Sequence, residues 1–550
     1  MIRRSLLVLL ASLCFATTLP AQTRETQTHE ALTPGEARAE HALEAAKKQG
    51  APELYALLKA MPKGADLHMH LSGAVYAETF IAEAAKQGLC VAPVDRGIPA
   101  VPEGQDALRF VEPQHDKPND CAPGDVPASD ALQRQPLYDD LVDSFSMRAF
   151  VPSEGIDGHD QFFATFARYG GLKDVHGEWL DEVATRAAAQ NEQYLEIMST
   201  PPFSHAAALG YKLGWPAGAE HSITPAQLAE LRTKLLDAGL RDEVATDVKE
   251  LADAQSARIS IEHCKEIVED AELLDLARRQ PCAIKIHWLY QVLRGFPPQQ
   301  VFAQTLLGFE VASVDPDVVG LNFVMPEDGY LSMRDYHLQM LMLDYLHSVY
   351  PRVHITLHAG ELAPGMVPPA GLSFHIREAV ELGHAQRIGH GVDILHEDHP
   401  YQLLHEMAQK HIMVEVNLTS NDVILGIKGS DHPLHAYIAA HVPFALSTDD
   451  EGVSRIDLTH EYVKAVLDQN LDYAQLKQSA RASLEHSFLP GKSLWAAPDD
   501  FTHRTTACAA PITESPTPSS ACKALLHSSE KAAEQYELER RFAAFEAAAR

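Results

Sequence analysis

Residues 318–324 read Val318-Val319-Gly320-Leu321-Asn322-Phe323-Val324, and residues 353–357 read Val353-His354-Ile355-Thr356-Leu357. Each stretch is a short apolar run, and a helical stretch of sequence separates the two. A strand, a helix and a second strand in this order predict two parallel strands of one sheet. Six further runs of the same kind occur along the chain, at residues 65–71, 194–198, 283–289, 387–389, 412–416 and 442–446.

Eight such runs, alternating with helical stretches over roughly 400 residues, favour an α/β fold of the (β/α)8 TIM-barrel type with insertions. The alternative is a doubly wound open sheet. The barrel is expected within residues 61–490. Residues 91–127 contain seven prolines, so we expect an irregular insertion at about 91–135, after the first strand.

Helical sequence flanks the predicted barrel on both sides. We expect an N-terminal helical extension in residues 22–60 and a loop and helix in residues 491–550. The helical segments 34–60 and 530–550 either form a homodimer contact or cover the ends of the barrel.

The first 21 residues are typical of a secretory signal. Arg3 and Arg4 precede an apolar run, Ser5 to Phe15, that is too short to span a bilayer, and small residues lead to Ala21. We expect cleavage near Ala21 and export to the periplasm or the medium; the alternative is a membrane anchor. The rest of the chain contains no second apolar stretch of about 18 residues, so no stable membrane insertion is expected.

Composition excludes other classes of protein. Hydrophobic residues make up 46% and charged residues 22%, which is neither a disordered nor a collagen-like composition. The 45 Lys and Arg against 76 Asp and Glu give a net charge of −31. Nucleic acid is therefore not an expected partner, because phosphate contacts need clustered cations.

Cysteine usage fits an exported protein. One of the seven cysteines, Cys14, lies in the signal segment, which leaves six. We expect Cys508 to pair with Cys522, because both lie in a polar tract rich in Pro, Ser and Thr. Pairing of nearest neighbours also gives Cys90–Cys121 and Cys264–Cys282, and the last two residues are equally consistent with free thiols.

Histidines and acids gather where the predicted strands end. His68 and His70 stand two residues apart, so they point to one face of a strand. His358, His390 and Asp449 follow three other runs. In a barrel, these ends converge at one mouth, where that fold carries its active sites. Three histidines and a carboxylate, with a position left for water, are the ligands of a catalytic zinc ion.

These motifs resemble those of the adenosine deaminase family. The opening run, Met61 to Ala74, contains Asp66-Leu67-His68-Met69-His70-Leu71, and three further motifs follow in that family's order over about residues 55–490. The signal segment, the cysteines and the insertion resemble the exported branch, the adenosine deaminase-related growth factors and their bacterial relatives. The three further motifs are His358-Ala359-Gly360-Glu361, Gly389-His390-Gly391 and Ser447-Thr448-Asp449-Asp450.

The resemblance implies a role for each motif residue. Glu361 would protonate the purine ring nitrogen beside the reacting carbon. His390 would orient the attacking hydroxide and stabilise its charge, and Asp450 would hydrogen-bond the five-membered ring. One zinc ion per chain would be held by His68, His70, His358 and Asp449.

Two positions depart from the family's pattern in the substrate pocket. Ser72 stands where the family usually has an aspartate that meets the sugar. Met325 aligns with a glycine whose backbone N–H meets the purine. The polar run 417–421 is a further candidate for lining this pocket.

The resemblance thus implies a zinc-dependent hydrolase that deaminates adenosine or a close 6-aminopurine nucleoside, a small-molecule substrate, to the 6-oxo product and ammonia. One alternative keeps the fold and the metal but changes the substrate to another amino-heterocycle or a 5′-substituted adenosine. A second alternative is an extracellular binding or growth-factor-like protein.

Overall fold

The computed structural model describes residues 32–94 and 107–549, apart from residues 154, 174, 262–280 and 515. The expected signal segment and Cys264 lie outside the described residues, so the signal and the pairing of Cys264 stay predictions. Among the described residues, no helix has the length and the apolar character that crossing a membrane requires.

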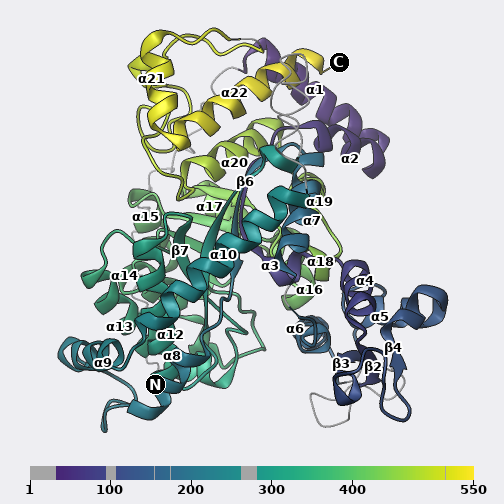
Figure 1. The fold of residues 1–550 in the computed structure, drawn as a ribbon. Coiled ribbons are helices and arrows are strands. Elements are labelled where there is room, and N and C mark those ends of the chain that lie inside the picture. Colours follow the sequence, from purple (N-terminus) through teal and green to yellow (C-terminus); the bar gives the residue numbers. More distant parts are fainter. Residues whose placement is uncertain are drawn as a thin grey trace, which may run out of the picture.

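A single parallel sheet of eight strands forms the centre of the molecule (Figure 1). All eight predicted runs are strands of this sheet, and helices surround it, so the (β/α)8 barrel is confirmed. The strands follow one another in sequence order: β1 (Gly64–His70), β5 (Glu192–Ser199), β6 (Lys285–Leu293), β7 (Val318–Val324), β8 (His354–Ala359), β9 (Arg387–His390), β10 (Met413–Val416) and β11 (Phe444–Leu446).

The barrel closes between its first strand and the residues that follow its last one. Met69 and Asp449 form a parallel bridge. Asp449 donates its backbone N–H to the carbonyl of His68 at 2.8 Å, and His70 donates to the carbonyl of Asp449 at 3.4 Å. These bonds distinguish a closed barrel from the open sheet that was the alternative.

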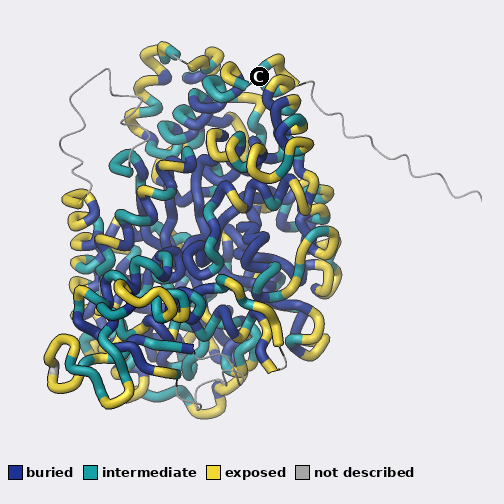
Figure 2. The backbone as a smooth tube through the Cα atoms, turned by 90° about the vertical axis from the view of Figure 1, so that its right-hand side faces the viewer, coloured by how far each residue is buried: buried dark blue, intermediate teal, exposed yellow. Residues whose placement is uncertain are grey.

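Helices cover the outside of the barrel, and Figure 2 shows the buried backbone concentrated at its centre. Residues 158–189 form two helices, α6 and α7, which are separated at Gly170 and Gly171. These and the other helices after the insertion are α6 (Gly158–Tyr169), α7 (His176–Ala189), α8 (Ser204–Leu213), α9 (Pro225–Asp237), α10 (Arg241–Ile261), α12 (Pro298–Val314), α13 (Tyr330–Val349), α14 (His375–Glu381), α15 (Pro400–Gln409), α16 (Leu418–Leu425), α17 (Leu434–Ala439), α18 (Glu451–Ser454), α19 (Leu458–Asp468) and α20 (Tyr473–Glu485).

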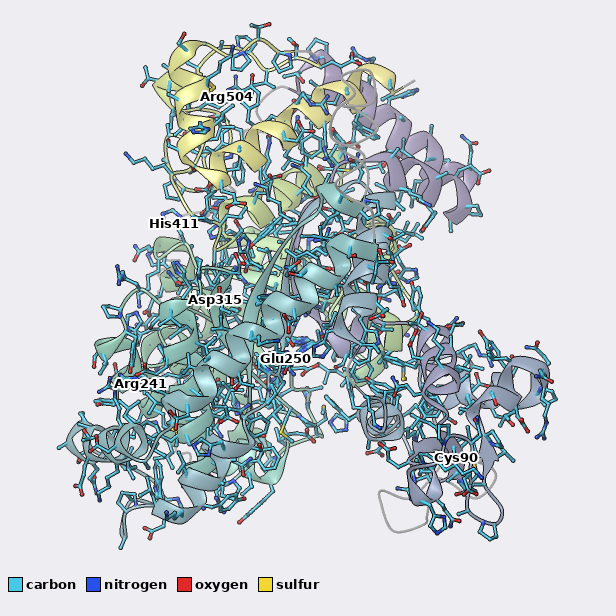
Figure 3. All side chains as sticks on the ribbon, in the orientation of Figure 1. Cys90, Arg241, Glu250, Asp315, His411 and Arg504 are labelled. Atoms are coloured by element: carbon cyan, nitrogen blue, oxygen red, sulfur yellow. A yellow bond between two sulfur atoms is a disulfide. The ribbon has the colours of Figure 1, made fainter. Side chains whose placement is uncertain are left out.

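The insertion after β1 contains a small sheet of its own, which the proline-rich sequence did not predict. Its antiparallel strands β2 (Cys90–Pro93), β3 (Leu108–Val111) and β4 (Val126–Pro127) pair in the order β3-β2-β4. The Cys90–Cys121 disulfide is confirmed, and Figure 3 shows Cys90 in this lobe beside the barrel. The helices of this region are α3 (Leu71–Ala74), α4 (Ala77–Gln87) and α5 (Gln135–Ser144).

Helices from both ends of the chain cover the amino end of the barrel. The predicted N-terminal helix divides at Gly50, whose φ is 121°, into α1 (Pro34–Gln49) and α2 (Ala51–Ala60). At the other end, α22 (Glu530–Ala548) contacts the first residues of two strands: Arg541 donates to the Glu192 carbonyl, and Lys285 pairs with Glu530 at 2.8 Å. These helices lie away from the opposite, carboxyl end of the barrel, where the motif residues of the strand ends are found.

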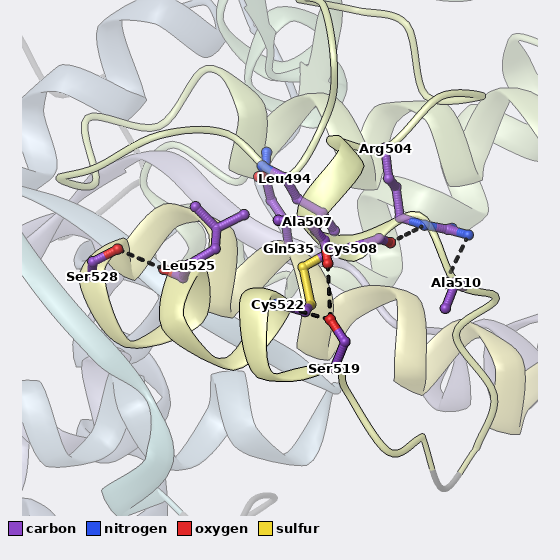
Figure 4. Close-up of a disulfide and its surroundings, with 10 residues drawn as sticks. All are labelled: Leu494, Arg504, Ala507, Cys508, Ala510, Ser519, Cys522, Leu525, Ser528 and Gln535. Carbon is purple, nitrogen blue, oxygen red and sulfur yellow. Dashed lines mark hydrogen bonds between the residues drawn. A yellow bond between two sulfur atoms is a disulfide. The ribbon is translucent and has the colours of Figure 1, made fainter.

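A disulfide constrains the polar tract before α22, as expected from the sequence. The Cys508–Cys522 disulfide is confirmed (Figure 4). Both cysteines are buried and pack with Leu494 and Ala532. Cys522 lies in the first turn of a short helix, α21 (Ser520–Ser528), and its N–H donates to the side chain of Ser519, which caps this helix.

Candidate metal centre

Four buried side chains converge at the carboxyl end of the barrel. His68 and His70 end β1, His358 lies near the end of β8, and Asp449 follows β11; their ligand atoms all lie within 4.8 Å of one another. His358 Nε2 lies 3.1 Å from His68 Nε2 and 3.3 Å from His70 Nε2, and His70 Nε2 lies 3.2 Å from Asp449 Oδ1. The structure therefore brings together the four residues expected to bind metal.

The other nitrogen of each imidazole is engaged by an oxygen. His68 Nδ1 donates to a carboxylate oxygen of Glu415 at 2.6 Å. His70 Nδ1 donates to Gln291 Oε1 at 3.2 Å, and His358 Nδ1 donates to Asn322 Oδ1 at 3.0 Å. A neutral imidazole with its proton on Nδ1 carries a lone pair on Nε2. In this neutral form, all three Nε2 atoms present lone pairs to the same point.

This arrangement fits a metal ion. Three lone pairs and a carboxylate that face one another without protons between them repel, and a cation relieves the repulsion. Tetrahedral zinc, with Zn–N bonds of about 2.0–2.1 Å, places neighbouring ligand atoms about 3.3 Å apart, close to the separations that join His358 to the other two histidines. The donor set suits Zn²⁺, and outer oxygens that fix the tautomers are typical of zinc histidines.

Glu415 belongs to a buried charge network beneath the ligands. Its Oε1 accepts a hydrogen bond from Arg387 Nε at 2.5 Å, and Arg387 also pairs with Glu196 at 2.7 Å. Burial alone would raise the pKa of Glu415, but Arg387 and His68 bring it down to about 2. The carboxylate is therefore ionised at neutral pH and holds the proton of His68 on Nδ1.

Glu361 lies beside the ligands without being one of the four. The carboxylate of Glu327 accepts hydrogen bonds from the N–H groups of Gly360 at 3.1 Å and Glu361 at 2.7 Å, which fixes the backbone at this point. Burial raises the pKa of Glu361 well above its usual range, and Asp449 and Glu327 raise it further. Its carboxyl group therefore favours the protonated form.

His390 ends β9 and is fully buried. Its Nδ1 lies 3.7 Å from Glu361 Oε1, and its Nε2 lies 3.9 Å from Asp449 Oδ2. Burial lowers the pKa of His390 to about 3, although Asp449 opposes this. The imidazole is thus neutral and lies between the Glu361 carboxyl group and Asp449, one of the four expected metal ligands.

A cavity of about 420 Å³ opens over these groups. Ser72, Met325 and Asp450 line it, as expected of substrate-binding residues, together with His70, His358, Glu361 and Asp449. Burial raises the pKa of Asp450 to about 8; His70 opposes this shift and Asp449 adds to it. The run 417–421 does not line the cavity, because α16 turns it toward His390. The apolar wall is made by Phe162, Phe163 and Phe166 of α6 with Leu293, Val324 and Pro326.

Three site residues other than glycine have left-handed backbone conformations. The φ angles are 90° at Met325, 67° at His390 and 60° at Asp449. Such conformations cost of order 1–3 kcal/mol each and concentrate at functional sites. The Met325 side chain occupies space that Gly295 leaves open: a Cβ at Gly295 would lie 2.8 Å from Met325 Cε.

Several residues of the site were not predicted from the sequence: Asn322, Gln291, Glu415, Glu327 and the aromatic face of α6. Asn322 and Glu415 are single polar residues inside otherwise apolar strands, and this pattern is the signal that could have found them. The aromatic wall comes from a helix that follows the insertion, and no motif marks it.

Part of the chain is similar in sequence to adenosine deaminases. A family model described as adenosine deaminase matches residues 243–496. The adenosine deaminase of Clostridium perfringens is 35% identical over 135 residues, which are 24% of this chain and 37% of that protein. That of Shewanella denitrificans is 35% identical over 147 residues, 26% of this chain and 41% of that protein. The matched segments thus span about two fifths of the length of these relatives.

Among solved structures, a cog1816 amidohydrolase with bound Zn from Burkholderia ambifaria covers 80% of this chain and 88% of its own, at 18% identity and a TM-score of 0.47. The sequence matches confirm the resemblance to the adenosine deaminase family, and the family model matches a range that contains strands β6 to β11. His358, Glu361, His390, Asp449 and Asp450 lie within the range of the family model, whereas His68 and His70 lie before it. Strand β1 brings those two histidines to the same centre.

Proposed function

We propose that this chain is a zinc-dependent hydrolase that removes the amino group of adenosine or a close 6-aminopurine nucleoside. The products are ammonia and the 6-oxo compound. The observation that carries the proposal is the convergence of a four-residue ligand set with Glu361, whose pKa is raised, on one cavity. A protein that only binds a ligand has no need of a buried proton donor beside such a set.

His68, His70, His358 and Asp449 would hold one zinc ion per chain. Bound there, zinc supplies a water molecule whose pKa is lowered to about 7, and hence a nucleophile at neutral pH. The chain itself contributes the rest. Glu415, Gln291 and Asn322 keep the three imidazoles in the tautomer that binds metal.

Glu361 would act as the general acid. Attack on the ring carbon that bears the amino group is favoured when the adjacent ring nitrogen receives a proton. The raised pKa of Glu361 favours the protonated form of its carboxyl group, which can then supply that proton. The Glu327 carboxylate accepts hydrogen bonds from the backbone N–H groups of Gly360 and Glu361. This contact positions the Glu361 carboxyl group, which is not one of the four metal ligands.

The cavity favours a neutral, flat substrate. Three phenylalanines form one wall, and none of the residues that line it is Lys or Arg. Beside this wall, the ring of His159 packs on Phe163 and pairs with Asp328 at 3.0 Å. Because no Lys or Arg of the described part of the chain lines the cavity, we infer that a nucleoside is preferred to a nucleotide.

A second candidate substrate class follows from Ser72 and Met325. Ser72 offers a sugar a neutral hydroxyl group instead of a carboxylate, and the Met325 side chain occupies part of the cavity. These two residues favour a substrate with an altered sugar, such as a 5′-substituted adenosine, or another amino-heterocycle.

Ammonia release from a panel of 6-aminopurines, measured with the zinc-loaded protein, tests the proposal. The panel contains adenine, adenosine, a 5′-substituted adenosine and AMP. We expect release from at least one nucleoside, at a higher rate than from AMP. Glu361→Gln should lower kcat by roughly 10²–10⁴-fold with its zinc content unchanged.

Glu397→Gln is the matched control for this variant. Glu397 is also a buried glutamate, and burial raises its pKa to about 7, but it does not line the cavity. We expect its activity to remain near that of the wild type. A Glu361→Gln protein with full zinc and normal turnover would remove Glu361 from the mechanism and contradict the assignment.

A further inference from the structure

A chain of hydrogen bonds leads from a backbone amide of α17 to His390. It begins where the Leu434 N–H donates to His432 Nδ1 at 3.2 Å. A backbone N–H can only donate, so His432 Nδ1 must carry a lone pair. His432 is buried, and burial lowers its pKa to about 4, with Lys464 and His435 acting in the same direction. The neutral ring therefore has its proton on Nε2.

The next link fixes the orientation of an amide. His432 Nε2 lies 3.1 Å from Asn421 Oδ1, and this nitrogen carries the proton, so Asn421 accepts through its oxygen. The Asn421 amide nitrogen then faces the other way, toward His390 Nδ1, at 2.9 Å. An amide N–H only donates, so His390 Nδ1 must accept.

Neighbouring groups do not reverse this assignment. Asn417 Nδ2 lies 3.5 Å from both ring nitrogens of His390, so it favours neither tautomer. Glu361 Oε1 lies 3.7 Å from Nδ1, which is beyond hydrogen-bond distance. The contact with Asn421 is the shortest that His390 Nδ1 makes to any of these three groups.

We propose that Asn421 and His432 are positioning residues that hold His390 as the tautomer with its proton on Nε2. That atom faces Asp449 Oδ2 and the ligand set, so His390 meets the attacking oxygen as a hydrogen-bond donor. A neutral imidazole that already has a proton on Nε2 has no lone pair there with which to accept another. His390 therefore stabilises charge on the nucleophile and is not its base. The catalytic part of this inference rests on the proposed deaminase function; the tautomer itself does not.

Neutron diffraction from deuterium-exchanged crystals of the zinc-loaded wild-type protein tests the tautomer directly. We expect deuterium on His390 Nε2 and on His432 Nε2, and none on His390 Nδ1. Deuterium on His390 Nδ1 would overturn the inference. Because this result does not depend on turnover, a protein that shows the expected tautomer and deaminates no aminopurine would overturn the proposed function alone.

Asn421→Asp tests the consequence for catalysis. Both oxygens of a carboxylate accept hydrogen bonds, so the aspartate accepts one from a protonated His390 Nδ1. The variant keeps the shape of the side chain but no longer holds the His390 proton on Nε2. An incorrect tautomer at a catalytic histidine can cost up to about 10⁴-fold in kcat. We expect kcat to fall by between about 10²- and 10⁴-fold, with smaller changes in KM and zinc content. An unchanged kcat in a variant with deuterium on Nδ1 would contradict the positioning role.

A pair of variants at His432 separates this role from a structural one. His432→Gln keeps an N–H donor for Asn421 and should retain most of the wild-type kcat. His432→Leu removes the donor, so that the Asn421 amide is free to turn, and should lower kcat by at least about 10-fold. His435→Leu is the control, because His435 lies three residues further on and donates to Gln469 instead. Equal losses of kcat in His432→Gln and His432→Leu would show that the N–H group donated to Asn421 does not control His390.

Discussion

The backbone N–H of Asp449 donates to the carbonyl of His68 at 2.8 Å, and the side chains of the same two residues face one centre, with His68 Nε2 3.6 Å from Asp449 Oδ1. The contact that closes the barrel therefore also sets the distance between the first and last metal ligands. A change in the closure of the sheet would move both ligands.

Substitution of Asp449 can separate these two roles. Asp449 has a φ of 60°, a conformation that asparagine tolerates and alanine does not. Asp449→Asn should weaken zinc binding but leave the stability of the zinc-free protein close to that of the wild type. Asp449→Ala should weaken zinc binding and also destabilise the zinc-free protein by about 1–2 kcal/mol. Chelator competition and urea unfolding measure the two effects, and equal stability of the two zinc-free variants would show that the backbone is not strained there.

Glu415 should control zinc affinity from outside the ligand set. Glu415→Gln removes the charge that holds the proton of His68 on Nδ1, whereas Arg387 keeps its other partner, Glu196, at 2.7 Å. Loss of such an outer partner typically costs 10–100-fold in metal affinity, so we expect the dissociation constant for zinc to rise by about that factor. Chelator competition provides the measurement. Unchanged zinc affinity in Glu415→Gln would mean that the charge of Glu415 is not needed for His68 to bind zinc.

The strands and the motif residues could be predicted because each signal is local. An apolar run identifies a strand, and the fold places the end of every strand at the same mouth, so His68 and His358 could be brought together from sequence positions alone. Glu415 and Asn322 could not be assigned in this way. Each is one polar residue in an apolar strand, and its purpose appears only when the neighbouring strand shows what it faces.

Features that depend on packing between distant segments were also missed. The aromatic wall of the cavity comes from α6, which packs over the barrel mouth although no sequence pattern connects Phe162 to Glu361. The amino-end cover formed by α22 was one of two open alternatives, because an amphipathic helix fits a barrel end or a second subunit equally well. The contacts of Arg541 and Lys285 place α22 on the barrel, and a homodimer remains a prediction.

Met325 should limit what the cavity accepts. Its φ of 90° suits glycine, and its side chain both lines the cavity and packs over Gly295. Met325→Gly enlarges the cavity and removes the backbone strain. We expect kcat/KM for nucleosides to rise relative to that for adenine by roughly 10–200-fold, the range that a single change of pocket volume produces. The same panel of 6-aminopurines gives the measurement, and an unchanged preference would exclude Met325 from substrate selection.

The Cys508–Cys522 disulfide should stabilise the C-terminal tract without affecting activity. The two residues are 14 apart in sequence, and closing a loop of about this length contributes roughly 3 kcal/mol. The Cys508→Ala, Cys522→Ala double variant should be cleaved faster by proteases between these positions and keep its kcat, because the tract lies beside α22, at the amino end of the barrel. Protease resistance equal to that of the wild type would show that packing on Leu494 and Ala532 is sufficient.

Acidification should lower the stability of the folded protein through the buried His432. Its pKa is lowered to about 4 by burial, with Lys464 and His435 adding to the effect, whereas an unfolded histidine titrates near ~6.5. Between these two values the unfolded chain binds a proton that the folded chain does not. The stability contributed by the neutral ring is therefore complete above about pH 6.5 and is lost as the pH falls toward about 4.

The comparison of wild type with His432→Gln isolates this effect, because glutamine does not titrate. Urea unfolding of both proteins without zinc removes any contribution from metal release. From about pH 7.5 to about pH 5, the wild type should lose about 2 kcal/mol more than the variant. If the two lose the same amount, His432 keeps its pKa near the unfolded value and is protonated in the folded protein at the lower pH. A protonated ring cannot accept the Leu434 N–H, so in that case the first link of the chain that sets His390 would be lost at the lower pH and present only near neutral pH.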